Sequence, residues 1–124
     1  MNKVLGLLIA LTSVNAMAYE ISDLNGTWKA RPCGVGATIK ISVPDGATTE
    51  MNQPVNVAAS SRYLLFLRAS ISCQVTKIAE NKFESFCQSQ GVYDHTYIEF
   101  VDENSYLETD LSHGCGVTLT KRVK

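Results

Sequence analysis

The chain has 124 residues, 45% hydrophobic and 19% charged, with a formal net charge of −1. This length suits one domain with a core of its own. The charge is unevenly distributed, because residues 83–120 carry seven acidic side chains and no Lys or Arg. Such a sector repels nucleic acid and anionic membranes and would attract a cationic partner or divalent ions. The alternative is a solvated polar face that keeps the protein soluble.

Residues 1–18 predict a secretory signal peptide. Lys3 precedes an apolar run over 4–11, and the segment ends in Ala-Met-Ala, the usual pattern of a cleaved leader. The run is too short for a membrane span. We expect cleavage before Tyr19, a periplasmic or secreted location, and a single domain over 19–124.

Four cysteines follow the predicted cleavage point. An even number in an exported chain indicates two disulfides. A zinc site is the alternative, but it favours close Cys-x-x-Cys pairs. Here no two cysteines are closer than Cys73 and Cys87, so we expect disulfides and no metal.

Period-two alternation of apolar and polar side chains recurs along the chain and predicts strands. Residues 21–24 suit a short turn of helix or an irregular lead-in, and 47–61 allow a long loop, a short helix or an irregular strand. Residues 63–75 form either one long strand or two strands across a bend near Ala69-Ser70. The other expected strands are 26–30, 37–43, 83–89, 96–101, 106–109 and 115–122. About eight strands joined by tight turns predict an all-β fold, either an antiparallel meander barrel or a sandwich.

Strand arithmetic suggests how the cysteines pair. A hairpin turn centred on Glu80 places Cys73 opposite Cys87 on the same face, which permits a bridge. The remaining pair, Cys33 and Cys115, would then join the first strand to the last.

The second bridge also predicts how the barrel closes. Paired residues in an antiparallel ladder have a constant index sum, which the Cys33–Cys115 pair sets at 148. Trp28 then faces Thr120, and Lys121 and Arg122 lie beside the indole. A cation over an indole stabilises by about 0.5–2 kcal/mol, and the contact would cover the bottom of a barrel.

These residues carry a resemblance. Gly26-Thr27-Trp28 near the start, with Lys121-Arg122 ending the last strand, resembles the calycin superfamily of lipocalins, fatty-acid-binding proteins and avidins. In that superfamily a Gly-x-Trp on the first strand packs against a basic residue from the last. The resemblance implies a barrel that binds a small ligand. The Arg and Tyr that hold a carboxylate in fatty-acid-binding proteins are replaced here by Lys121 and Val123, so that subsite is not carried over.

We therefore expect a non-enzymatic barrel that binds a small apolar or amphipathic ligand and needs no cofactor. Inward-facing residues of odd number would line its interior. These candidate lining residues are Ile39, Ile41, Leu65, Leu67, Val117 and Leu119.

A protein-binding module is the alternative. Bacterial periplasmic lysozyme inhibitors are similar in class, being exported, disulfide-bonded β-barrels of about this size whose acidic loops meet a cationic enzyme. The acidic sector over 84–110 would serve that purpose through charge complementarity. Its candidate partner face is Glu99, Asp102, Glu103, Glu108 and Asp110.

Catalytic chemistry finds little support. His95 and His113 flank the last hairpin near Asp94 and Asp110, which suits either a metal site or, as we expect, surface histidines near turns. No serine stands in a nucleophile-elbow context, and cysteines held in disulfides supply no thiol nucleophile.

Overall fold

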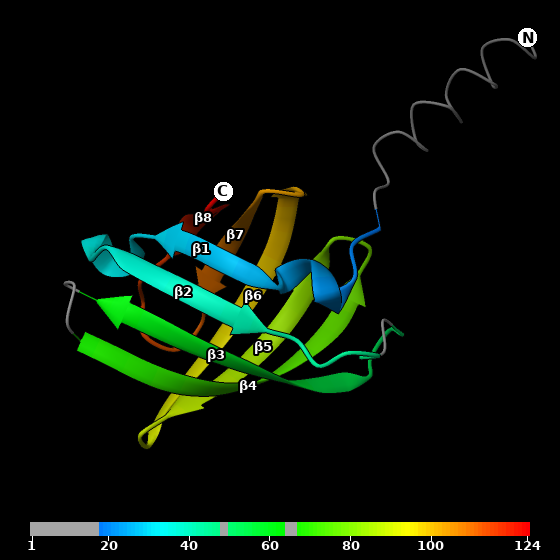
Figure 1. The fold of residues 1–124 in the computed structure, drawn as a ribbon, viewed down its shortest axis with the longest axis horizontal. Helices are drawn as coiled ribbons and strands as arrows, with labels where there is room; N and C mark the ends of the chain where they lie inside the picture. Colours follow the sequence, from blue (N-terminus) through cyan, green and yellow to red (C-terminus); the bar gives the residue numbers. More distant parts are fainter. Residues whose placement is uncertain (1–17, 48–49, 64–66) are drawn as a thin grey trace, which may run out of the picture.

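The structure is a computed structural model that describes residues 18–47, 50–63 and 67–124. All of the predicted signal peptide except Ala18 lies outside these residues. Eight antiparallel strands form a closed barrel in chain order (Figure 1), and the last strand pairs with the first. The strands are β1 (Gly26–Ala30), β2 (Ala37–Ser42), β3 (Pro54–Tyr63), β4 (Leu67–Ala79), β5 (Lys82–Ser89), β6 (Val92–Asp102), β7 (Ser105–Asp110) and β8 (Val117–Arg122).

The predicted all-β meander barrel is therefore confirmed, and a sandwich is excluded. Two 3-10 turns flank β1 at its opposite ends: η1 (Ile21–Leu24) and η2 (Pro32–Gly34). In Figure 1, η1 is the blue turn on the right and η2 the cyan turn on the left. Buried aromatic side chains fill the η1 end, which we call the closed end. The η2 end opens onto a cavity and is the open end.

For one segment the sequence left three alternatives open, and the structure shows the strand. β3 occupies most of the segment 47–61, where no sustained period was found, and its inward residues Val55, Val57 and Ser61 are buried. The long strand expected over 63–75 is β4, which begins at Leu67. The small side chains of Ala58 to Ser61 carry little hydropathy contrast, which concealed the alternation.

Aromatic side chains fill the closed end. Trp28 lies 4.8 Å from Tyr106 and 6.3 Å from Phe100 between ring centroids, and Tyr19 stacks on Phe100 at 4.5 Å. Leu24 of η1 is fully buried, and its carbonyl accepts a 2.9 Å hydrogen bond from the Trp28 indole. Edge-to-face and stacked rings of this kind stabilise a core beyond the area they bury.

Arg122 covers this aromatic cluster. Its guanidinium lies 4.2 Å from the Trp28 ring and donates to the carbonyls of Asp23, Asn25 and Glu103 at 2.7–3.1 Å. Gly26 has φ of +129°, and a Cβ there would lie 2.8 Å from the guanidinium. The glycine before Trp28 thus leaves room for the arginine.

The register of this closure differs from the prediction by two residues. Trp28 pairs with Arg122 rather than Thr120, and Lys121 pairs with Lys29 on the outer face. The index sum failed because Cys33 is not part of the ladder. It lies in η2 with φ of +51°, where the chain leaves the sheet.

Both predicted disulfides are confirmed. Cys73 and Cys87 are direct partners in the β4–β5 ladder, with Cα atoms 4.0 Å apart. Cys33 and Cys115 join η2 to the segment before β8, with Cα atoms 5.0 Å apart. The β1–β8 ladder pairs only Trp28 with Arg122 and Lys29 with Lys121. This seam between the first and last strands is therefore closed by hydrogen bonds at one end and by a disulfide at the other.

Candidate functional site

The open half of the barrel encloses a cavity of about 450 Å³. That volume lies within the range of about 300–1,000 Å³ typical of small-molecule sites. Its inner wall is mostly aliphatic, with contributions from η1 and from β2, β3, β4 and β6. The main apolar lining residues are Leu24, Ile39, Ile41, Val57, Ile71, Val75 and Ile98.

The predicted lining residues divide into three groups. Ile39 and Ile41 do line the cavity. Leu65 lies outside the described residues, and for Leu67 the structure describes only its backbone place at the start of β4. Val117 and Leu119 lie on the outer face of β8, 61% and 47% exposed.

The assignment of Val117 and Leu119 was therefore wrong. Because Arg122 lies over Trp28 inside the barrel, the even-numbered residues of β8 face inward. Thr118 lines the cavity and Thr120 is buried. The apolar residues of β8 lie on its outer face, so its hydropathy pattern predicted the wrong inward face.

Three carboxyl groups lie at the opening of this cavity: Asp94 on β6, and Glu108 and Asp110 on β7. Among the described residues, no Lys or Arg lines the cavity. The open end therefore has a concentrated negative charge inside an otherwise apolar barrel.

Glu108 is the most perturbed of these acids. Burial raises the pKa of its carboxyl from 4.5 to about 7, and repulsion from Asp94 and Asp110 adds to the shift. Within the described chain the Glu108 carboxyl has no hydrogen-bond donor and no cation beside it. It is thus a largely buried acid that lines the cavity with no counter-charge beside it among the described residues.

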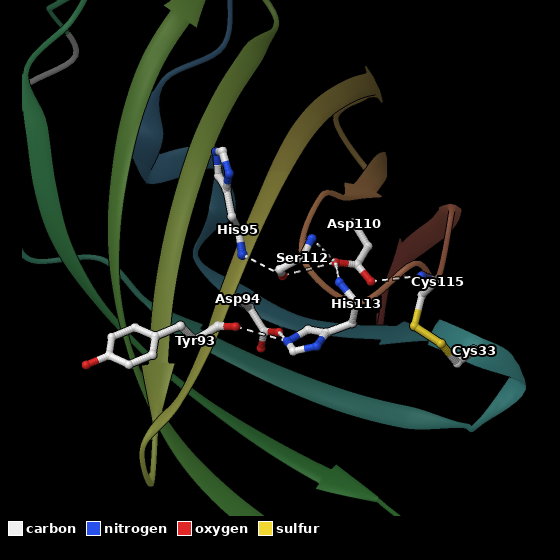
Figure 2. Close-up of polar contacts among 8 residues, drawn as sticks. All are labelled: Cys33, Tyr93, Asp94, His95, Asp110, Ser112, His113 and Cys115. Carbon is white, nitrogen blue, oxygen red and sulfur yellow. Dashed lines mark hydrogen bonds and ion pairs between the residues drawn. A yellow bond between two sulfur atoms is a disulfide. The ribbon is translucent and has the colours of Figure 1, made fainter.

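Asp110 is held differently, as Figure 2 shows. Its Oδ1 accepts from the backbone amides of Ser112 and His113, both at 3.0 Å, and its Oδ2 accepts from that of Cys115 at 2.9 Å. These hydrogen bonds lower the pKa of Asp110 to about 2. The carboxylate fixes the loop before β8 beside the Cys33–Cys115 disulfide and stays charged.

The two histidines lie in separate environments. Nε2 of His113 is 2.6 Å from Asp94 Oδ1 and 3.0 Å from the Tyr93 carbonyl. Both are acceptors, so this nitrogen carries the proton. The His95 ring points away from His113 (Figure 2), and its Nε2 lies 2.8 Å from Glu84.

This separation bears on the metal hypothesis. The His95 ring also stacks on Phe86 at 4.1 Å between centroids, on the outer face of β5 and β6. Across the described part of the chain, no group of three or more His, Cys, Asp or Glu side chains is arranged to hold a metal ion.

The predicted acidic partner face does not form one surface. Glu99, Asp102 and Glu103 are exposed on β6 and the turn after it, toward the closed end. Glu108 and Asp110 face the cavity instead. The acidic residues are close in sequence, but strand alternation and the barrel distribute them between inside and outside.

Sequence reasoning placed neither Ser61 nor Glu108 in the barrel interior. Ser61 lines the cavity with only 3% of its surface exposed, and its Oγ has no hydrogen-bond partner among the described residues. Glu108 was assigned to the surface. Its position two residues from Tyr106, on the same side of β7, is the signal that could have placed it inside.

The fold and the cavity together define a class: a disulfide-bonded, eight-stranded meander barrel that is open at one end. No protein-family model matches the chain, and no curated protein or solved structure matches it either. In the described residues, no helix is both long and apolar enough to cross a bilayer.

Proposed function

We propose that this is an exported, non-enzymatic, calycin-like protein that binds a small apolar or amphipathic ligand inside its barrel. The observation that carries the proposal is the open cavity of about 450 Å³ with an aliphatic inner wall. Burial of apolar ligand surface there contributes roughly 25 cal/mol per Å². The two disulfides support export, since such bonds persist in oxidising compartments.

The calycin resemblance gains support from the closed end. A Gly-x-Trp on the first strand lies under a basic residue of the last, in a meander barrel of eight strands. The basic residue in that place is Arg122, while Lys121 lies outside. All four cysteines are engaged in disulfides, so a thiol nucleophile plays no part in the proposal.

Filling the cavity tests the proposal. Ala59 lines the cavity, whereas its neighbour Ala58 is exposed on the other face of β3. We expect the neutral fluorescent probe N-phenyl-1-naphthylamine to bind the wild-type protein saturably. Ala59→Phe should weaken that binding at least tenfold, and Ala58→Phe should leave it unchanged.

Circular dichroism on both variants checks that the barrel is intact. Absence of saturable binding to the wild type would refute the proposal. Equal affinities of the Ala59→Phe and wild-type proteins would show that the probe binds elsewhere.

A further inference from the structure

We propose that the cavity selects a cationic amphipathic ligand, a small organic amine whose ammonium group lies against Glu108 while its apolar body fills the barrel. This inference rests on the proposed function and adds the chemical class of the ligand. It depends on the charges at the opening and on two polar groups that have no partner.

The first argument is the sign of the charge around Glu108. The titratable groups that face this part of the cavity are Asp94 from β6, Asp110 from β7, His113 from the loop before β8, Tyr63 from β3 and Tyr106 from β7. Among the described lining residues there is no fixed positive charge. A fatty acid would bring one more carboxylate into a site that already holds three, whereas an ammonium group would relieve their repulsion.

The second argument is that Glu108 alone of the three acids lacks a partner. Asp110 accepts four hydrogen bonds from its loop, and Asp94 is paired with His113 at 2.6 Å. The Glu108 carboxyl is more buried than either and has no donor beside it among the described residues. An ionised group removed from water requires a counter-charge, and a bound ammonium would supply it.

Ser61 gives an independent indication that the cavity receives a ligand with a polar atom. Its side chain is almost completely buried, and its Oγ is unsatisfied within the described structure. Buried hydroxyl groups nearly always have a partner. Ser61 lies on β3, four strands around the ring from the β7 that carries Glu108. The two groups without partners therefore belong to opposite walls of one cavity.

The protonation of Glu108 gives the binding a pH dependence. A carboxyl with a pKa of about 7 must lose its proton to pair with an ammonium group. Asp110 stays ionised over this range, because its hydrogen bonds keep its pKa near 2. Affinity for an amine should therefore fall as the pH drops below 7, by up to about tenfold per unit, and binding near neutral pH should release a proton.

Three ligands of equal chain length test the proposal by isothermal titration calorimetry at pH 8: octylamine, octan-1-ol and octanoate. In the wild type, octylamine should bind at least about tenfold more tightly than octan-1-ol, as expected for a charge-assisted contact, and octanoate least tightly. In Glu108→Gln the amine and the alcohol should bind within about twofold of each other. Glu99→Gln, a matched change at an exposed acid on the outside of β6, should retain the wild-type preference.

The outcomes separate the two proposals. If none of the three ligands binds the wild type, the proposed function fails. If octan-1-ol binds as well as octylamine, or octanoate binds best, the barrel is a ligand-binding protein but the cationic specificity is wrong. If Glu108→Gln keeps the preference for the amine, Glu108 does not carry it. Titration of the wild type in buffers of different ionisation enthalpy, which needs no variant, must also show proton release on amine binding near pH 7.

Discussion

The two ends of the barrel are built on opposite principles. At the closed end the Trp28 indole and the Arg122 guanidinium reach carbonyl acceptors, and aromatic rings fill the space between them. At the open end the Glu108 carboxyl and the Ser61 hydroxyl lack partners among the described residues, and like charges lie together. The closed end can therefore supply the stability that the open end loses, which is the usual relation between a scaffold and its site.

The same contrast appears along the seam between β1 and β8. At the closed end their ladder pairs Trp28 with Arg122, and the Val123 amide donates to the Thr27 carbonyl at 2.8 Å. At the open end the Cys33–Cys115 disulfide holds the two segments. Hydrogen bonds and packing hold one end, and a covalent bond holds the other.

Removal of the seam disulfide should have the largest effect on stability. Cys33→Ser/Cys115→Ser opens a loop of 82 residues, which on the chain-entropy model lowers the free energy of unfolding by about 4–5 kcal/mol. Cys73→Ser/Cys87→Ser opens a loop of 14 residues and should cost about 3 kcal/mol. Guanidinium unfolding monitored by Trp28 fluorescence measures both. A larger loss of stability in Cys73→Ser/Cys87→Ser than in Cys33→Ser/Cys115→Ser would show that the seam disulfide is not the main one.

Replacement of Arg122 should break the closed end. Arg122→Met leaves three backbone carbonyls without their donor and removes the contact with Trp28. We expect a loss of about 3 kcal/mol, because the substitution removes hydrogen bonds from a charged donor and the cation–π contact with the indole. Lys121→Met, on the exposed face of the same strand, should change stability by less than about 0.5 kcal/mol. Equal effects of the two substitutions in urea unfolding would show that Arg122 does not hold this end together.

Burial of Glu108 at the open end should make the free energy of unfolding depend on pH. The folded pKa of Glu108, about 7, lies above its ordinary value of 4.5. The folded protein therefore holds more protons than the unfolded chain between these pH values, and stability falls as the pH rises through this window. The expected decrease is on the order of 2 kcal/mol.

Urea unfolding at pH 5 and pH 7.5 measures this decrease, and Glu108→Gln should abolish it. Asp110 has the opposite sign, because its stabilisation is present above pH 3.8 and disappears as the pH falls through about 2. It therefore contributes no slope between pH 4.5 and 7. A wild-type protein that is equally stable at both pH values would contradict the placement of Glu108.

The His113–Asp94 pair should contribute least. Both side chains are 47% exposed, and ion pairs reached by water stabilise by less than about 1 kcal/mol. We expect His113→Ala to lower the melting temperature by no more than a few degrees in differential scanning calorimetry. A loss as large as that of Arg122→Met would show that the open end contributes substantially to stability.

Much of the scaffold could be predicted from the sequence, because its determinants are local. The alternation in β2 and the turn at Glu80 fix the neighbouring strands, and the Cys73–Cys87 pairing follows from them. β3 remained only one of three alternatives for its segment, because its residues from Ala58 to Ser61 differ too little in hydropathy to show a period.

Of the candidate site, Ile39 and Ile41 were predicted, but its acidic part was not, because that part is assembled only when the barrel closes. Asp94 and Glu108 come from different strands, and nothing local to either indicates that they face one cavity. The prediction assigned the wrong residues of β8 to the interior, because the apolar Val117 and Leu119 point outward. The position of Arg122 over Trp28 shows that the even-numbered residues of β8 face inward.

The Cys33–Cys115 bond also restricts how a ligand could enter and leave. It makes the chain from residue 33 to residue 115 a covalent ring that surrounds the cavity. In a barrel without this bond, β1 and β8 could separate and release a bound ligand through the gap between them. Here the bond holds the two sides of the seam together at the end where the ladder is missing. A ligand of the kind proposed would then pass along the barrel axis, past Asp94 and the loop that Asp110 holds in place.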